Sequence, residues 1–255
     1  MDKFTPPDRK IEELRNTFLR AEPFRFLVID NFLPRQQYEA ASEVFPGPDA
    51  PMWLQYRSGR ENKKLQSRNF DAVADPLAST LAMINSPSFV DWLGLVTGIE
   101  NLLPDPEYHG GGLHQTLAGG HLGLHIDYNR HSTHEWYRRL NVILYFNNEW
   151  EDSWGGCLEL WTDGVKACAH SIEPHGNRLV IFETTETSWH GHPDPLTPPP
   201  GVTRKSIAAY YYTEAAPQGE IAPEHNTVFQ ERPGETFKAT PLEKVAQLVR
   251  ALKIR

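Results

Sequence analysis

The sequence predicts a mainly β protein supported by N-terminal helices, with its strands arranged as a sandwich or a barrel. Before residue 98, several segments carry apolar residues at helical spacing. After residue 108, the chain consists of short runs rich in Val, Ile, Leu and aromatic residues, each bounded by turn residues. No composition break separates the two parts. The 255 residues are therefore expected to form a single domain.

The N-terminal part is expected to contain helices around one strand. The periodicity predicts helices at 11–21 and 35–45, and the stretch "PFRFLVIDNFLP" between them predicts a strand that ends at Asn and Pro. Two further helices are expected at 75–85 and 86–98, because each begins with Asp or Ser followed by Pro, and Gly98 ends the second. Residues 46–74 are polar and irregular, which predicts a loop.

The second part is expected to supply the strands of the barrel. The runs are "HLGLHID", "RLNVILYFN", "CLELW", "KACAHSI", "RLVIF" and "RKSIAAYYYT". Many short strands without helices between them favour a sandwich or a barrel. The expected layout is a helical and strand support at 1–107, a β core at 108–215, and a C-terminal loop with a short helix, "PLEKVAQLVRALK", at 216–255.

Composition and charge narrow the class of protein. The net charge is −8 and no basic block is present, so neither nucleic acid nor an anionic membrane surface is an expected partner. The charged N-terminus lacks the apolar run of a signal peptide, and no apolar stretch approaches the ~20 residues that span a bilayer. Cys157 and Cys168 form no disulfide framework, so a cytoplasmic location is expected, with a bridge between them left open.

Two His-x-Asp motifs are candidates for metal binding. They are His125 with Asp127, and His192 with Asp194. Alternate residues of a strand share a face. His125 and Asp127 therefore project from one side of "HLGLHID", and the apolar residues Leu122, Leu124 and Ile126 project from the other side. Pro193 interrupts the second pair and predicts a loop. The first motif therefore has the rigid geometry that a metal site needs.

A third ligand is expected from "SWHG". Two histidines and one carboxylate on one face, with open positions opposite, are typical of non-haem Fe(II) oxygenases. His190 is preferred over His192 because it lies nearer the strand "RLVIF" and because Gly191 lets the chain turn away from the metal. His192 precedes Pro193 and is expected at the rim of the site. Downstream, Arg204 and Ser206 share a strand face and could together bind a carboxylate.

In this order, "HID", "SWHG" and "RKS" resemble the 2-oxoglutarate- and Fe(II)-dependent dioxygenases, in particular the prolyl-4-hydroxylase-like branch. The resemblance covers about residues 108–213 and, more weakly, "FLVIDNFLP" near the N-terminus. It implies a double-stranded β-helix, which is a jelly-roll barrel. It also implies an oxidoreductase that uses Fe(II), 2-oxoglutarate and O2, with the need for ascorbate left open.

The resemblance assigns roles to individual residues. His125, Asp127 and His190 would bind Fe(II), and Arg204, with Ser206 beside it, would pair with the far carboxylate of 2-oxoglutarate. The hydroxyl group of Tyr145 in "NVILYFN" would contact the same carboxylate. The chain departs from the pattern at Gln115 and Thr116, where many relatives carry a tyrosine. The implied products are succinate, CO2 and a hydroxylated substrate. The carboxylate of Asp127 argues against halogenation.

The substrate is not fixed by these motifs. Residues 127–139 are expected to overhang the mouth of the barrel, and the candidate substrate-contacting residues are Tyr128, Arg130, His131 and Asn141. A small metabolite such as an amino acid, nucleotide or sugar is favoured over a peptide. Two alternatives stay open: a prolyl or peptidyl hydroxylase that acts on a protein, and a non-catalytic jelly roll that binds a metal or a ligand. Arg204 favours an enzyme, because a barrel that only binds metal has no use for a carboxylate anchor.

Overall fold

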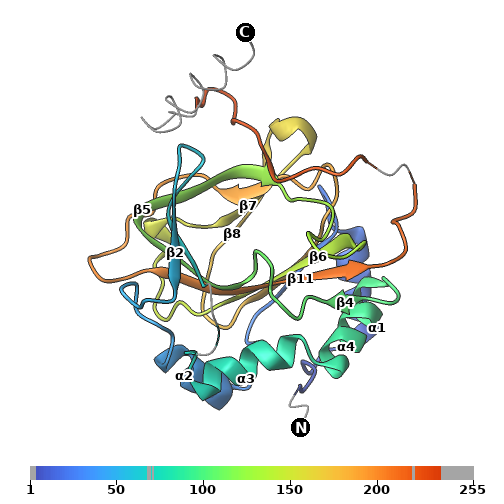
Figure 1. The fold of residues 1–255 in the computed structure, drawn as a ribbon, viewed down its shortest axis with the longest axis horizontal. Coiled ribbons are helices and arrows are strands. Elements are labelled where there is room, and N and C mark those ends of the chain that lie inside the picture. The colour runs from blue at the N-terminus through green and yellow to red at the C-terminus, as the bar shows by residue number, and fades with distance from the viewer. Residues whose placement is uncertain (1–3, 68–69, 71, 220–221, 237–255) are drawn as a thin grey trace.

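A curled antiparallel sheet with helices along one side makes up the fold (Figure 1). The computed structural model describes residues 4–67, 70, 72–219 and 222–236. The described residues form the helices α1 (Ile11–Arg20), α2 (Arg35–Glu43), α3 (Asp75–Ile84) and α4 (Pro87–Thr97). The mainly β fold class with a helical N-terminal layer is thereby confirmed.

The helices begin and end close to the residues predicted for them. At α4, the Ser86 side chain accepts a hydrogen bond from the Phe89 backbone N–H, and Pro87 occupies the first turn. Gly98 follows the helix in the left-handed conformation, with φ of +75°. Inside the sequence-predicted strand at 23–34, only Phe26–Ile29 forms the strand β1.

The sheet runs in the order β1-β9-β6-β11-β5-β10-β7-β8. β3 and β12 also pair with β5, β2 pairs with β3, and β4 pairs with β11. The remaining strands are β2 (Trp53–Arg57), β3 (Glu61–Ser67), β4 (Leu103–Pro104), β5 (Gly112–Ile126), β6 (Tyr137–Tyr145), β7 (Leu158–Trp161), β8 (Cys168–Ile172), β9 (Leu179–Glu183), β10 (His190–His192), β11 (Arg204–Thr213) and β12 (Val228–Phe229).

Alternate side chains of β6 and β11 face the hydrophobic core and a cavity. Val142, Leu144, Ile207 and Ala209 pack into the main hydrophobic core together with residues of α1, α3 and α4. The residues between them line a cavity on the other side of the sheet: Asn141, Ile143, Ser206 and Ala208. The helical layer therefore supports the floor of this cavity from behind.

β5 takes part in both halves of the barrel. Its first residues pair with β11 and its last residues pair with β10 and β12, whereas β3 pairs with residues on both sides of Gly119. The strand changes partners around Gly119, which has φ of +75°, and Gly120. A Cβ atom on Gly120 would lie 2.8 Å from the Leu117 carbonyl oxygen, so this crossing requires glycine.

Several expectations are corrected by the structure. Residues 46–74 are not simply a loop, because β2 and β3 form an antiparallel hairpin within them. Their Gln, Lys, Asn and Glu residues have low strand propensity, which hid the hairpin. The expected loop at His192 begins one residue later, since His190–His192 is a strand. The C-terminal helix at 241–253 lies outside the described residues.

Two further features bear on the expectations above. Cys157 and Cys168 are free cysteines, so no bridge joins them. Within the described ranges, no helix is long and apolar enough to cross a membrane.

Candidate metal centre and its cavity

Neighbouring strands bring three metal-ligand side chains together. His190 on β10 lies directly opposite His125 on β5, and Asp127 follows the end of β5. The candidate ligand atoms of these three residues all lie within 4.8 Å of one another. His125 Nε2 is 3.7 Å from Asp127 Oδ1, and His190 Nε2 is 3.5 Å from Asp127 Oδ2. All three residues are buried.

Backbone carbonyl groups fix the orientation of both imidazole rings. His125 Nδ1 is 2.9 Å from the Gly123 carbonyl oxygen, and His190 Nδ1 is 2.8 Å from that of Ser188. A carbonyl oxygen only accepts hydrogen bonds, so each Nδ1 carries the proton and each Nε2 presents a lone pair toward Asp127. Burial lowers the pKa of His125 to about 3, and burial also lowers the pKa of His190. Both rings are neutral near pH 7, as metal ligands must be.

Arg138 and Asn141 hold the carboxylate of Asp127. Arg138 Nη2 lies 3.1 Å from Asp127 Oδ2, and Asn141 Nδ2 donates a 2.7 Å hydrogen bond to the same oxygen. Burial alone would raise the pKa of Asp127, but Arg138 and the two histidines hold this pKa well below its usual range. Asp127 is therefore a carboxylate with one oxygen already fixed by neighbours.

The guanidinium of Arg138 is itself enclosed. It donates hydrogen bonds of 3.1 and 2.7 Å to Asn141 Oδ1. It also stacks between the rings of Tyr128 and Tyr210, at 4.3 and 3.6 Å from their centroids. A fully buried arginine thus joins the candidate metal site to two tyrosines of the barrel.

Together the donor set fits a divalent iron ion. It offers two neutral imidazole nitrogens and one carboxylate oxygen from one side, and the cavity lies on the other. His192 is not part of this group. It is buried and lines the cavity, whereas the sequence predicted a rim position.

Gly191 keeps β10 close to β5. A Cβ atom at this position would lie 2.8 Å from both the Leu122 and Gly123 carbonyl oxygens. The sequence predicted that Gly191 would let the chain turn away from the metal. In the structure it is instead a strand residue that lets two backbones approach, which brings His190 to His125.

Arg204 forms the inner end of the cavity. It is 7% exposed, its Nε donates to the Gly156 carbonyl oxygen at 2.7 Å, and its Nη2 donates to the Tyr145 hydroxyl at 3.0 Å. No carboxylate pairs with Arg204 within the part of the chain that the structure describes. A buried guanidinium without an anion favours an anionic ligand in the space beside it. Ser206 lines the same cavity, and Tyr145 is fully buried behind Arg204.

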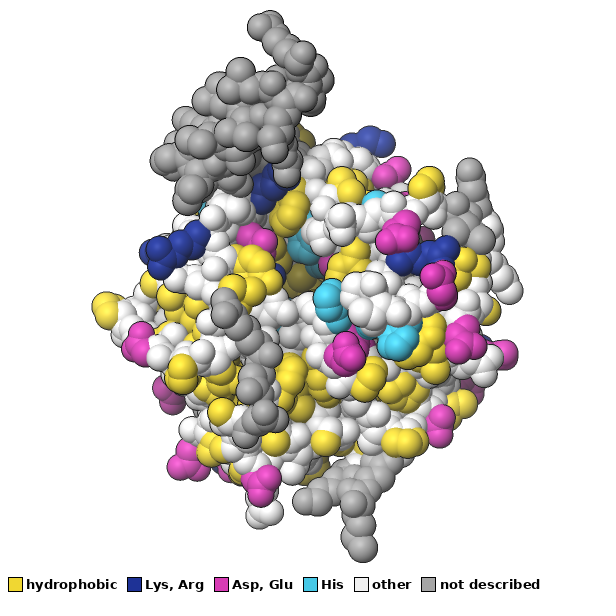
Figure 2. Space-filling model, viewed as in Figure 1, with side chains coloured by type: hydrophobic (Ala, Val, Ile, Leu, Met, Phe, Trp, Pro, Cys, Tyr) yellow, Lys and Arg dark blue, Asp and Glu magenta, His cyan; other side chains and the backbone are white. Residues whose placement is uncertain are grey.

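The cavity has a volume of about 270 Å³ and connects the two ends just described. Figure 2 shows the barrel hollowed on the viewed face, with histidine side chains in and beside the opening. Its lining includes the three candidate metal ligands, Arg204, Ser206 and part of the β2–β3 hairpin. One space can therefore hold a metal, a carboxylate ligand bound to Arg204, and a substrate.

The expected substrate residues are divided by the structure. Tyr128 and Asn141 line the cavity. Arg130 instead lies over the ring of Tyr137, 3.6 Å from its centroid, and His131 lies 3.6 Å from Asp105. Neither Arg130 nor His131 is among the residues that line the cavity.

Sequence reasoning missed two groups of residues. Arg138 was hidden by a β-bulge: it pairs with Tyr212, whereas Leu140 pairs with Tyr211, so Arg139 is an extra residue in β6. The bulge reverses the alternation and brings Arg138 to the face of Asn141. The second group lines the mouth, and its residues are Tyr56, Glu61, Lys64, Gln66, Thr227 and Phe229.

Comparison with known proteins agrees with this geometry. Residues 111–212 match the family model of the 2OG-Fe(II) oxygenase superfamily, whose members use Fe(II), 2-oxoglutarate and O2. The matched range contains His125, Asp127, His190 and Arg204. The chain has no significant match among curated proteins.

Comparison with solved structures identifies the fold. A prolyl-4-hydroxylase from Pseudomonas putida is similar at 17% identity and a TM-score of 0.55, covering 78% of this chain and 98% of that one. A prolyl hydroxylase from Trichoplax adhaerens, in complex with a hypoxia inducible factor peptide, gives 19% identity and a TM-score of 0.53, covering 80% and 91%. HygX from Streptomyces hygroscopicus, with nickel, 2-oxoglutarate and hygromycin B bound, gives 13% and 0.50, covering 78% and 87%. The fold is a double-stranded β-helix.

Proposed function

We propose, on the premise that residues 111–212 belong to the 2OG-Fe(II) oxygenase superfamily, that this protein hydroxylates a C–H bond of a small metabolite. The reaction consumes 2-oxoglutarate and O2 with the substrate and yields succinate, CO2 and the hydroxylated product. One oxygen atom enters succinate and the other enters the product. In this proposal, His125, Asp127 and His190 hold Fe(II).

One observation carries the proposal. A buried arginine, Arg204, has no carboxylate partner among the described residues and lines the same cavity as the two histidines and the aspartate. A protein that only bound a metal would have no reason to bury this charge. We assign Arg204, with Tyr145 and Ser206, to the far carboxylate of 2-oxoglutarate.

Bound iron would supply the activation of O2 that oxidises both 2-oxoglutarate and the substrate. The chain itself contributes geometry and the exclusion of water. Asn141 and Arg138 fix one oxygen of Asp127, and two backbone carbonyl groups fix the histidine rings. Ile143, Leu158 and Ala208 give the cavity apolar walls on which a hydrocarbon portion of the substrate can pack.

The mouth of the cavity supports a small substrate over a peptide. Arg60, in the turn of the β2–β3 hairpin, lies 5.7 Å from the ring centroid of Phe229 in β12. Phe229 in turn lies 5.3 Å from the ring of His125. The hairpin and β12 thus meet beside the candidate metal ligands, whereas an extended peptide would need an open groove there.

Polar contacts hold residues 228–232 in this position. Arg232 forms two hydrogen bonds with Asp194, of 2.7 and 3.1 Å. Gln230 donates to the Gly164 carbonyl oxygen at 2.9 Å. These contacts support a mouth that stays narrow on the side of Phe229.

The first test is formation of succinate from 2-oxoglutarate by the purified protein with Fe(II) and O2. A panel of metabolites and peptides is then screened for a product heavier by the mass of one oxygen atom. No succinate above that of a metal-free sample, with an active relative run in parallel, would refute the enzymatic function.

A matched pair of variants tests the ligand assignment. His190→Ala is expected to lose bound iron, because it removes one of three ligand atoms. His192→Ala is expected to retain iron, although the side chain lines the same cavity. Iron retained in the first variant and lost in the second would reverse the assignment.

A further inference from the structure

A second cation lines the cavity at its outer end. Lys64 on β3 pairs with Thr116 on β5, and Thr116 pairs with Arg204 on β11. All three side chains line the cavity. Neighbouring strands lie about 4.8 Å apart, so the backbones of Lys64 and Arg204 are separated by about 10 Å. The lining of the cavity therefore carries one cation on each side of Thr116.

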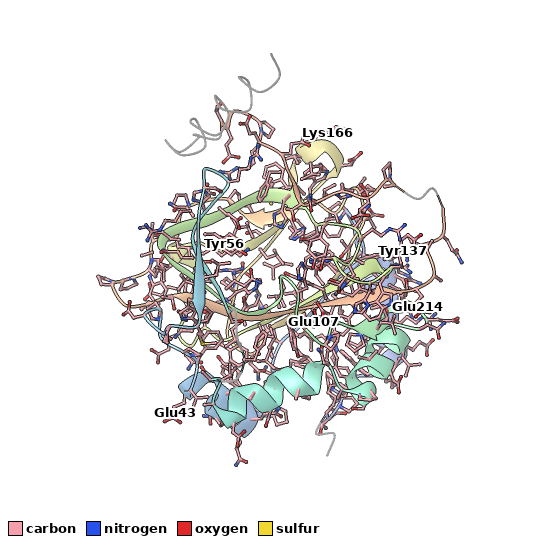
Figure 3. All side chains as sticks on the ribbon, viewed as in Figure 1. Glu43, Tyr56, Glu107, Tyr137, Lys166 and Glu214 are labelled. Atoms are coloured by element: carbon pink, nitrogen blue, oxygen red, sulfur yellow. The ribbon has the colours of Figure 1, made fainter. Side chains whose placement is uncertain are left out.

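The two cations differ in depth. Arg204 is 7% exposed at the inner end, whereas the side chains of Lys64 and its partner Glu61 are 16% and 21% exposed. The Lys64 Nζ lies 5.1 Å from the centroid of the Tyr56 ring. Tyr56 is on β2, beside the opening of the barrel (Figure 3). If the inner cation binds the cosubstrate, the outer one lies where the substrate enters.

The backbone is shaped to bring Lys64 and Glu61 together. Residues three apart on a regular strand face opposite sides, yet Glu61 Oε2 lies 3.4 Å from Lys64 Nζ. The register of β3 shifts between Asn62 and Lys64, and Lys63 between them has φ of +51°. A lysine in this conformation is uncommon and strained. The consequence is that both charges line the cavity, while Lys63 is turned outward and donates to the Ala118 carbonyl oxygen.

The charged pair still has capacity for a ligand. An ammonium group has three N–H donors, and among the described residues Lys64 uses one of them, in a long hydrogen bond to Glu61. In the same residues, the carboxylate group of Glu61 accepts no hydrogen bond other than the one from Lys64. A cation and an anion side by side match a ligand that carries the opposite pair. The smallest such ligand is a free α-amino acid, whose carboxylate and ammonium groups are joined by one carbon.

We infer that the outer end of the cavity binds a free α-amino acid, with Lys64 binding its carboxylate and Glu61 its ammonium group. This inference rests on the proposed hydroxylase function, since it names the substrate class of that site. The cavity of about 270 Å³ also has to accommodate 2-oxoglutarate, which favours a ligand as small as an amino acid.

The test is equilibrium binding without O2. Calorimetry measures the affinity of the Fe(II)- and 2-oxoglutarate-loaded protein for the twenty α-amino acids, and for the amide and the N-acetyl derivative of each that binds. Lys64→Gln is expected to lower the affinity for the tightest-binding amino acid at least tenfold. It is expected to lower the affinity for 2-oxoglutarate less than twofold. Lys63→Gln is the matched control, because the neighbouring lysine points away from the cavity, and it is expected to change neither affinity.

The derivatives identify which group of the amino acid each residue binds. The amide lacks the carboxylate, so Lys64→Gln is expected to have little effect on its binding. The N-acetyl derivative lacks the ammonium group, and the second variant, Glu61→Gln, is expected to have little effect on it. Glu61→Gln also keeps the inference testable if Lys64→Gln fails to fold.

Three outcomes would overturn the inference. No amino acid binds the wild type although succinate is formed; Lys64→Gln weakens 2-oxoglutarate as much as the amino acid; or Lys64→Gln and Glu61→Gln both leave amino-acid binding unchanged. The proposed function survives each of them. It fails separately if the protein neither binds 2-oxoglutarate nor produces succinate.

Discussion

At the scale of single residues, the candidate site depends on charged side chains that are buried away from water. Arg138 and Arg204 are both buried, but their partners differ. Arg138 has its counter-charge within the chain, in Asp127, whereas the partners of Arg204 among the described residues are neutral, Gly156 and Tyr145. The first arginine therefore stabilises a ligand residue, and the second is available to bind a ligand.

Replacing Arg138 with leucine is expected to destabilise the metal-free protein by about 3–5 kcal/mol, because it leaves Asp127 buried without its cation. Bound Fe(II) replaces part of the lost charge, so the metal-loaded protein should lose less. Chemical unfolding with and without the metal measures both losses. Arg139→Leu is the control: its guanidinium donates a hydrogen bond to the Thr213 hydroxyl group, and the expected loss is about 1 kcal/mol. Equal losses for Arg138→Leu with and without iron would contradict the role given to Arg138.

Replacing Arg204 with alanine is expected to weaken 2-oxoglutarate binding by about 2–5 kcal/mol, since a carboxylate would lose its charged partner. Metal affinity should change little, because Arg204 contacts none of the three candidate ligands. Titration of the iron-loaded protein with 2-oxoglutarate measures the effect, with Lys205→Ala as the control from the neighbouring position. A change of less than tenfold for Arg204→Ala would mean that another residue is the anchor.

At the scale of strands and helices, prediction from sequence succeeded where hydrophobic periodicity was strong. The helices at 11–20, 35–43, 75–84 and 87–97 and the strand of "RKSIAAYYYT" were predicted within one or two residues. The β2–β3 hairpin was missed because its residues are mostly polar, and β10 was missed because it has only three residues. Both depend on pairing with β5, which is distant in sequence.

Site residues could be predicted from the sequence only where the local strand pattern was regular. His125, Asp127 and Arg204 were candidates because they occupy one face of recognisable strands and match a known motif. Arg138 was not, because strand alternation fails at the bulge. Lys64 was not, because the register shift in β3 is determined by contacts with β5 and leaves no signal in the local sequence.

Replacing Gly191 with alanine tests the close approach of β10 to β5. The added Cβ atom would lie 2.8 Å from two backbone oxygens, so the strands must separate. We expect a loss of about 1–3 kcal/mol in stability and at least a tenfold loss of iron affinity, because His190 moves away from His125. Gly47→Ala is the control, since nothing lies within 4 Å of its Cβ position. Unchanged iron affinity in Gly191→Ala would show that the spacing of these strands is not critical.

At the scale of the whole molecule, the sites for the metal and for 2-oxoglutarate each connect strands that are distant in sequence. The candidate iron site links β5 to β10, and the Arg204 end links β11 to β6 and to Gly156. A ligand that binds only the folded state stabilises all of these connections together. The metal should therefore affect global unfolding and not only the cavity.

Removing the metal is expected to lower the melting temperature. At a free Fe(II) concentration one hundred times its Kd, binding contributes about 2.7 kcal/mol. For a protein of this size, that corresponds to about 5–10 °C. Scanning calorimetry under anaerobic conditions, before and after addition of a chelator, measures the shift. His190→Ala should show almost no shift, and an equal shift in that variant would place the stabilising metal elsewhere.

The β2–β3 hairpin has a consequence for how new activities could arise in this protein. Residues 53–67 pair with the barrel through β5, whereas the three candidate metal ligands and Arg204 lie on β5, β10 and β11 or directly beside them. The charged pair that we infer to bind the substrate, Glu61 and Lys64, thus lies on a different piece of chain from the candidate metal ligands and Arg204. Exchange of the hairpin alone, by recombination in nature or by grafting in the laboratory, is expected to redirect the enzyme to another metabolite while leaving its consumption of 2-oxoglutarate intact.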